Sequence, residues 1–390
     1  MTQAYPTYYV SKNGILVSLT MVALLWQCTQ TYTSPYKSPA TGYLVVEGFI
    51  SGNSPTQYTL SRTIPLPGDS TIPMVTGATV RVEGSDSSVH PLTDQGNGVY
   101  SDSLILSPNA QYRLRINIPG GESYLSDFAP FKITPPIDSI PWTYTDSGVN
   151  FSLYTHDPAN ATRYYQWEYQ QTWEYYSAEP SYYIYQASTN TVVQRTAAQL
   201  VYHCWKNAVS YDILLGSSAK LAQDVIYQFL LLNIPLNSQQ LAVRYSILVS
   251  QYALTQAAYN FLSLMQVNTE SLGSIFDVQP SQLIGNIHCL SNPNEPVIGY
   301  ISAGTVQQQR TFITRAQVPY WGYYYTCVEP DFKVPNDSAD LLFYYGKDDD
   351  VPINSYGSGQ YINAYFSNSE YCIDCTLQGG TTQKPSYWPN

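Results

Sequence analysis

The sequence predicts a mainly β protein, built of tandem immunoglobulin- or fibronectin-like β-sandwiches with a helical insertion in the second. Three observations predict this class. Short strand-like runs alternate with turn residues from Tyr43 onward. Tyrosine supplies 38 of the 390 residues, and its flat ring packs well on a pleated sheet. Only 12% of the residues are charged, so uncharged polar side chains must cover much of the surface.

The charge balance excludes one class of partner. The formal net charge is −11, and an acidic chain repels phosphate backbones, so we expect no nucleic-acid partner. The chain also lacks the polybasic stretches that bind anionic lipid headgroups. Solubility alone is a sufficient explanation of the acidity.

The N-terminus has the pattern of an export signal. Lys12 is the only basic residue before the apolar run of residues 14–26, which is too short to span a bilayer. Cys28 follows, as in a bacterial lipoprotein whose first mature residue is a lipidated cysteine. Residues 1–27 are therefore predicted to be a signal peptide, Cys28 the lipid anchor to the membrane, and residues 28–40 a tether. Trp26 and Gln27 are larger than signal peptidases prefer, which leaves open an ordinary signal peptide with a structural Cys28.

The first body module is predicted over residues 41–133. Residues 43–50, 58–63, 78–82 and 112–118 read as strands, and turns such as residues 119–121 separate them. About seven short strands of this kind are typical of an immunoglobulin-like sandwich. Residues 134–136, Thr-Pro-Pro, mark its end, because consecutive prolines resist both helix and sheet.

The second module, residues 134–326, contains a long strand over residues 164–175. Its aromatic side chains recur with the period of two that places them on one face of a sheet. Two interpretations remain, a platform for a ligand or partner such as a sugar ring, and the core of a sandwich; the core is favoured. The aromatic residues concerned are Tyr165, Trp167, Tyr169 and Trp173.

A helical insertion is predicted at about residues 217–282. Thr255 is a plausible N-cap, and Ala258, Phe261, Leu262 and Met265 then fall on one helical stripe. Residues 217–232 read either as a short helix or as an apolar strand, because periodicity does not decide between them.

Residues 327–390 read as a loop-rich tail packed on the second module. If Cys28 carries lipid, five cysteines remain for disulfides that pin this tail, and one of the five must stay free. They are Cys204, Cys289, Cys327, Cys372 and Cys375. The Cys-x-x-Cys spacing of residues 372–375 is followed by poor helix sequence, which disfavours a redox site. A zinc site needs a second pair of ligands, which His203-Cys204 or His288-Cys289 could supply, although the spacing does not require it. Residues 348–350, three aspartates, read as a solvated charge run rather than a Ca²⁺ site.

Several stretches together resemble a Bacteroidota family known as domain of unknown function 4249. They are residues 43–48, 167–169, 172–174, 244–249, 272–276, 292–300, 372–377, 379–380 and 384–385. The resemblance covers nearly the whole mature chain. It implies an outer-membrane lipoprotein, often encoded beside a TonB-dependent receptor, and it transfers no catalytic residue.

The leading hypothesis is therefore an outer-membrane-anchored accessory or binding lipoprotein that captures a substrate with a TonB-dependent transporter. A structural or adhesive cell-surface protein is the alternative. A glycan-acting enzyme is the least supported class, because Glu168 and Glu174 lie about 20 Å apart along one strand, too far for a glycosidase pair. No serine lies in a Gly-x-Ser-x-Gly elbow. The sequence thus assigns no catalytic, metal-binding or cofactor-binding residue, and no ligand.

Overall fold

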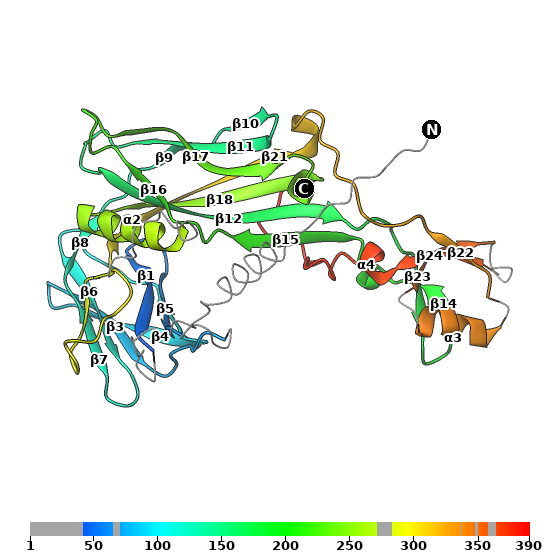
Figure 1. The fold of residues 1–390 in the computed structure, drawn as a ribbon, viewed down its shortest axis with the longest axis horizontal. Helices are drawn as coiled ribbons and strands as arrows, with labels where there is room; N and C mark the ends of the chain where they lie inside the picture. The colour runs from blue at the N-terminus through cyan, green and yellow to red at the C-terminus, as the bar shows by residue number, and fades with distance from the viewer. Residues whose placement is uncertain (1–41, 65–70, 271–282, 336, 348–349, 358–363) are drawn as a thin grey trace, which may run out of the picture.

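The computed structural model describes residues 42–64, 71–270, 283–335, 337–347, 350–357 and 364–390. It is mainly β, as predicted, and divides into three regions (Figure 1). The N-terminal strands form a module below one end of a long body of strands, and a small C-terminal lobe lies at the other end. Within the described residues no helix is both long enough and apolar enough to span a membrane.

The N-terminal module is a closed ring of eight strands, with two more strands attached. The ring runs β6-β3-β4-β5-β2-β1-β20-β8 and returns to β6, and β7 and β19 continue outward from β6. Its strands are β1 (Leu44–Ser51), β2 (Thr56–Arg62), β3 (Thr79–Gly84), β4 (Val89–Gly96), β5 (Val99–Asp102), β6 (Gln111–Asn117), β7 (Ser123–Ser126), β8 (Ala129–Lys132), β19 (Ile287–Cys289) and β20 (Ala303–Gly304). The immunoglobulin-like sandwich predicted for residues 41–133 is therefore wrong, because the sheet closes on itself.

Closure depends on β20, which arrives from far along the chain. Its residues pair in parallel with Ile50 and Ser51 on one side and with Phe131 and Lys132 on the other. A Cβ at Gly304 would lie 2.2 Å from the carbonyl oxygen of Lys132, so only glycine fits between the two neighbouring strands. The module consequently extends beyond the predicted boundary at residue 133 and includes part of residues 283–304.

Buried tyrosines fill much of this barrel. Tyr58, Tyr100, Tyr112 and Tyr124 have no exposed surface. The hydroxyl of Tyr100 donates to the carbonyl of Val75 at 2.9 Å, and that of Tyr124 donates to a carboxylate oxygen of Glu295 at 2.9 Å. Part of the unusual tyrosine content is thus explained by core packing. The hydroxyls of Tyr100, Tyr112 and Tyr124 reach partners at the edge of the core, whereas the buried hydroxyl of Tyr58 has none among the described residues.

Three arginines surround one carboxylate on the β3–β6 pair. Arg81 and Arg115 donate to Glu83 Oε1 at 3.0 and 2.6 Å, and Arg113 donates to Oε2 at 2.9 Å. Burial alone would raise the pKa of Glu83, but the three hydrogen bonds outweigh it and lower the pKa from 4.5 to about 2. The cluster therefore stabilises the barrel only while Glu83 is ionised.

We expect Glu83→Gln to lower the free energy of unfolding by about 2 kcal/mol at pH 7. Because the folded pKa is depressed, this contribution is complete above the unfolded pKa near 4.5 and is lost as the pH falls towards 2. Urea denaturation of both proteins at pH 7 and pH 3 measures the difference. The control, Glu122→Gln, removes a single more exposed ion pair with Arg62 and should cost at most about 1 kcal/mol. An equal effect at both pH values would contradict the assignment.

The second module contains two antiparallel sheets that pack face to face. The first contains β9 (Ile137–Ser139), β10 (Trp142–Thr145), β11 (Gly148–His156) and β17 (Val225–Pro235). The second contains β12 (Tyr164–Tyr176), β15 (His203–Val209), β16 (Leu214–Ser217), β18 (Arg244–Ala253) and β21 (Val306–Thr314). Side chains from both sheets, including Phe151, Leu153, Trp167 and Ile247, form one buried cluster. Short 3₁₀ turns lie at η1 (Ala197–Gln199), η2 (Gln239–Leu241) and η3 (Arg315–Gln317).

The predicted helical insertion of residues 217–282 contains strands as well as a helix. Residues 225–232 belong to β17, whose backbone pairs with β11 in the first sheet, so the strand alternative holds for them. Residues 271–282 lie outside the described residues. Among the described residues of this range the α-helix is α2 (Gln256–Glu270), and it begins where predicted, with Thr255 Oγ1 accepting the backbone N–H of Ala258 at 3.1 Å. The predicted stripe faces inward, since Ala258 and Phe261 are buried and Leu262 and Met265 are half-buried.

The C-terminal region has more regular structure than a loop-rich tail. It contains β22 (Asp331–Lys333), α3 (Ser338–Gly346), β23 (Asp350–Tyr356), β24 (Ala364–Ser369) and α4 (Glu370–Ile373). The sheet order is β22-β24-β23. A hairpin from the second module, β13 (Tyr183–Gln186) and β14 (Thr191–Gln194), joins this lobe, and Ser181 Oγ donates to the carbonyl of Pro352 at 2.8 Å. The tail is attached to the second module, as predicted, but its regular elements were missed because they are short.

Two disulfides form, as predicted, and one cysteine is unpaired. Cys204 of β15 bonds to Cys375 and so pins the tail to the second module. Cys327 bonds to Cys372 and closes a loop within the lobe itself. Among the described cysteines Cys289 is the free one, buried on β19. The two cysteines of the Cys-x-x-Cys spacing therefore pair with different partners and not with each other.

The final residues run back across the second sheet of the body. Trp205 and Thr381 exchange two backbone hydrogen bonds of 2.8 Å each. Farther along, Trp388 Nε1 donates to Glu174 at 3.0 Å, and the Arg310 guanidinium lies 3.7 Å from the centre of the Tyr387 ring. Together with the Cys204–Cys375 disulfide, these contacts hold residues 375–388 on the second sheet.

Candidate binding pocket

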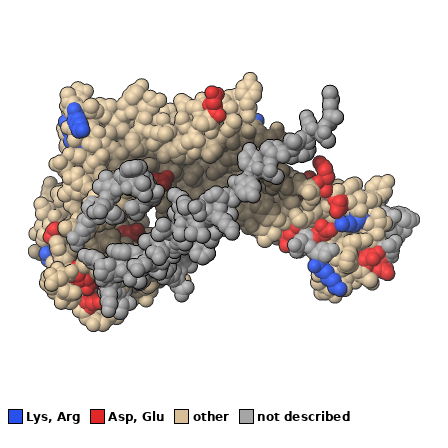
Figure 2. Space-filling model, in the orientation of Figure 1, with Lys and Arg blue, Asp and Glu red and all other residues tan. Residues whose placement is uncertain are grey.

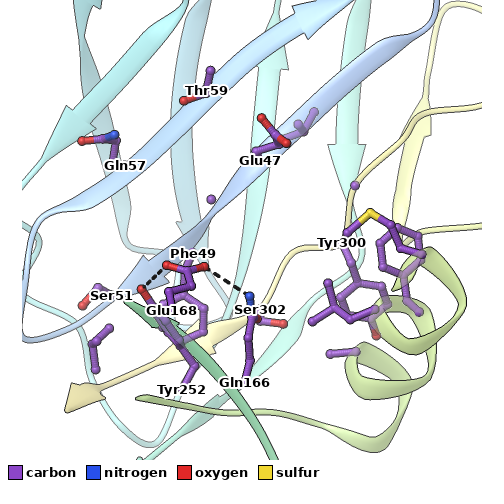
Figure 3. A pocket seen from close by; sticks show the side chains of 18 of the residues that line it. Glu47, Phe49, Ser51, Gln57, Thr59, Gln166, Glu168, Tyr252, Tyr300 and Ser302 are labelled. Carbon is purple, nitrogen blue, oxygen red and sulfur yellow. Dashed lines mark hydrogen bonds between the residues drawn. The ribbon is translucent and has the colours of Figure 1, made fainter. Parts of the chain in front are cut away.

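A pocket of about 480 Å³ lies where the barrel, the sandwich and α2 meet. Strands β1 and β2 of the barrel form one wall, β12 and β18 of the sandwich another, and α2 with residues 298–302 the rest. Figure 3 shows Glu47, Gln57 and Thr59 on the barrel side and Gln166, Glu168 and Tyr252 on the sandwich side. The volume is within the usual range for small-molecule sites.

Residues 298–302 are held against β1 by backbone hydrogen bonds. Val46 N–H donates to the carbonyl of Ile298 at 2.8 Å, and Ile50 N–H donates to that of Ser302 at 3.0 Å. Gly299 lies between these contacts with φ +145°, and a Cβ there would lie 2.3 Å from the carbonyl oxygen of Val46. Glycine at this position therefore permits the close approach that brings Tyr300 to the pocket.

Glu168 is fixed in the sandwich wall by two donors. Gln166 Nε2 donates to its Oε1 at 3.2 Å and Tyr252 Oη donates to its Oε2 at 3.0 Å, as the dashed lines of Figure 3 show. Gln166 lies directly opposite Tyr252 in the β12–β18 pair. The period of two along β12 turns Gln166 and Glu168 toward the pocket and the intervening Trp167 toward the core.

The environment disfavours the charge on Glu168. Its surface is open to the pocket, yet the surrounding protein desolvates the carboxylate and raises its pKa above 4.5, more than the Tyr252 hydrogen bond lowers it. Burial, followed by the nearby Glu168 charge, raises the pKa of Tyr252 as well, so Tyr252 remains a neutral donor. Glu47 is the other ionisable carboxylate of the lining, and the described lining contains no lysine, arginine or histidine.

The remaining wall is apolar. Four side chains of α2 face the space, namely Ala258, Phe261, Leu262 and Met265. The Phe261 ring lies 5.5 Å from that of Tyr300, and the Phe49 ring meets Tyr252 edge-on at 5.0 Å. The pocket thus combines carboxylate and amide groups on one side with hydrocarbon and aromatic surface on the other.

The aromatic residues proposed from the sequence do not line this pocket. Tyr165, Trp167, Tyr169 and Trp173 are 0%, 0%, 7% and 6% exposed. The ligand-platform interpretation is therefore wrong, and the alternative that these rings form the sandwich core holds, because they face the first sheet. The face of β12 that lines the pocket is the opposite one, formed by the polar residues between the aromatics, such as Gln166 and Glu168.

Glu168 and Glu174, the two carboxylates considered as a catalytic pair in the sequence, lie in different places. Glu174 accepts from Trp388 Nε1 at 3.0 Å and contacts His203 Nε2 at 2.8 Å, outside the pocket. The carboxylate that shares the pocket with Glu168 is Glu47, from the other module. Sequence reasoning missed Glu47, Phe49 and Tyr252, because no local spacing connects β1 with β12 and β18.

Other sequence features have simpler roles or fall outside the described residues. Within the described part of the chain, no three His, Cys, Asp or Glu side chains are grouped as metal ligands. Asp350 pairs with Lys333 at 3.1 Å, whereas Asp348 and Asp349 are not described. The signal peptide, Cys28 and the tether also lie outside the described residues.

Comparison with known families gives one match. The model of the family described as domain of unknown function DUF4249 matches residues 29–310, which include the barrel, the pocket and the two sheets of the sandwich as far as residue 310 in β21. The match ends before the C-terminal lobe. A search of the curated proteins found no match to this chain.

Proposed function

We propose, from the premise that this chain belongs to the family of domains of unknown function DUF4249, that it is a ligand-binding lipoprotein of the bacterial outer membrane. In this role it captures a small molecule and passes it to a TonB-dependent transporter. The leader pattern and Cys28 support export and a lipid anchor in a Bacteroidota cell. The proposal assigns binding and not catalysis to the pocket. We also propose that the two-sheet body, but not the barrel, is immunoglobulin-like.

The observation that carries the proposal is the pocket between barrel and sandwich. Its walls come from elements that are distant in sequence, and backbone hydrogen bonds join two of them, β1 and residues 298–302. The cavity is therefore built into the junction of the modules. Concave sites of this volume, mostly apolar with a few convergent polar groups, are the usual form of small-molecule sites.

The C-terminal lobe offers a surface for a protein partner. The Phe332 ring lies 5.1 Å from Phe366 and 5.7 Å from Tyr356, and these three side chains are 49%, 40% and 63% exposed. Figure 2 shows that charged side chains, sparse over the body on this face, gather on the lobe. Exposed aromatic clusters rimmed by charge are typical of protein interfaces.

Complementation tests the binding role. In a strain that lacks this gene, we expect growth on the transported nutrient to be restored by the wild type and by Tyr227→Ala, a change at an exposed tyrosine of the body. Leu262→Trp, which fills the pocket with a larger ring, should not restore growth although the protein reaches the membrane in normal amount. Restoration by Leu262→Trp would show that the pocket does not serve transport.

Co-purification tests the partner. The tagged full chain, extracted from outer membranes in mild detergent, should carry a TonB-dependent transporter with it, and Cys28→Ser should release the protein from the membrane fraction. Recovery of the chain without any transporter would overturn the proposed partnership.

A second candidate function is adhesion, and the aromatic surface of the lobe favours it. In that case Phe332→Ser with Phe366→Ser would reduce attachment of cells to a surface, while growth on every nutrient stays unchanged.

A further inference from the structure

We infer that the pocket binds an organic cation, a molecule with an ammonium group beside a short hydrocarbon or aromatic body. This inference deepens the proposed function, because it rests on the pocket being a binding site, and it names the chemical class of the ligand.

The charges of the lining favour a cation. Glu47 and Glu168 contribute two carboxylates from opposite walls, and the described lining has no basic side chain to neutralise them. Neither carboxylate takes part in a salt bridge within the described residues. A ligand that carries a carboxylate or phosphate would meet repulsion and no donor of opposite charge, whereas an ammonium group would supply the missing counter-ion.

Glu168 is held ready for a further donor. An ionised carboxylate has about four acceptor positions, and Gln166 and Tyr252 occupy two of them, one on each oxygen. These two donors fix the orientation of the group before a ligand arrives, so an ammonium N–H can bind to it without loss of side-chain freedom. A positive charge near Glu168 would offset the desolvation that raises its pKa and would favour the ionised carboxylate.

The opposite wall suits a hydrocarbon body. Leu262 and Met265 of α2 offer no hydrogen-bond donor there, and the rings of Phe261 and Tyr300 lie beside them. A sugar would place hydroxyl groups against this wall without partners, which costs free energy. An alkyl or aryl chain would bury apolar surface there, and an ammonium group near the Tyr252 and Phe49 rings would gain cation–π attraction.

Isothermal titration calorimetry of the full mature chain tests the inference with four probes. They are n-hexylammonium chloride, neutral 1-hexanol, sodium hexanoate and neutral methyl β-glucoside. We expect n-hexylammonium to bind most tightly, less so at high salt, and hexanoate not to bind. Glu168→Gln should weaken the affinity for n-hexylammonium by about 30-fold, because the ammonium group loses its charged partner. Glu329→Gln, at an exposed site outside the pocket, should leave this affinity unchanged.

The pH dependence adds a second readout. Since the pKa of Glu168 is raised, the free carboxylate is protonated at a pH where an ordinary glutamate is not. Affinity for n-hexylammonium should therefore rise with pH through that pKa, with release of a proton, and Glu168→Gln should flatten this part of the profile.

The outcomes separate the inference from the proposed function. If 1-hexanol or methyl β-glucoside binds as tightly as n-hexylammonium and Leu262→Trp abolishes that binding, the cation class is wrong and the pocket remains a binding site. If n-hexylammonium binding survives Glu168→Gln, or if none of the four probes binds, the inference is overturned. The proposed function is tested separately: it fails if Leu262→Trp restores growth in the complementation experiment, or if co-purification recovers no transporter.

Discussion

We expect Trp167→Ala to lower the free energy of unfolding of the sandwich by about 3–5 kcal/mol. The side chain is fully buried, its ring stacks on Tyr165 at 5.7 Å and lies 4.3 Å from Phe229. Truncation would remove these contacts and leave a cavity between the two sheets. Urea denaturation followed by far-ultraviolet circular dichroism measures the change.

The same substitution disturbs a buried polar network. Trp167 Nε1 donates to Gln251 Oε1 at 2.8 Å, and Gln251 Nε2 donates to the carbonyl of Pro135 at 2.8 Å and to Thr155 Oγ1 at 3.0 Å. Trp167→Phe keeps much of the volume but leaves Gln251 Oε1 without this donor, so we expect an intermediate loss of about 1–3 kcal/mol. Tyr227→Ala, at an exposed site, should change stability by less than about 0.5 kcal/mol. If Trp167→Ala matched this surface control, Trp167 would have no role in the core.

We expect the second large effect when the Cys204–Cys375 disulfide is replaced by two serines, with a loss of about 2–4 kcal/mol. The bond joins residues separated by 171 positions, so its removal returns much conformational freedom to the unfolded chain. It also frees the segment that Trp205 and Thr381 hold on the sheet. Limited proteolysis should then cut within residues 376–390, and denaturation should begin at lower urea concentration.

The other disulfide is the matched control. Cys327–Cys372 closes a shorter loop, with a separation of 45, within the lobe. Its double serine variant should leave the unfolding transition of the body in place and increase proteolysis of the lobe alone. An unchanged transition in the Cys204–Cys375 variant would show that the hydrogen bonds of the tail suffice to hold it.

Local patterns predicted the elements of this fold better than their assembly. The alternation of residues 112–118, the long strand at residues 164–175 and the stripe of α2 all correspond to observed elements, because each depends on nearest neighbours only. The same alternation fits a barrel and a sandwich equally. Closure of the barrel depends on the pairing of β20 with β1 and β8, and no local signal marks so distant a partner.

The pocket was hidden for a related reason. The sequence pointed to the aromatic face of β12 as a candidate binding surface. A strand of a sandwich, however, buries its aromatic face and leaves its polar face outside. Gln166 and Glu168 were the informative residues. They form a pocket only together with Glu47 of β1 and Leu262 of α2, which line the same space. These elements come together only in the complete tertiary structure.

The barrel cannot close until the ribosome has synthesised β20, because β20 lies far from the other barrel strands in the sequence. Strands β1 and β8 leave the ribosome well before Ala303 and Gly304, and until then each has an edge with unsatisfied backbone groups. Such edges recruit other strands and promote aggregation while the closing strand is absent. For the same reason, a fragment cut at residue 133 is an unsuitable domain for expression, whereas one that continues past residue 304 retains the closing strand.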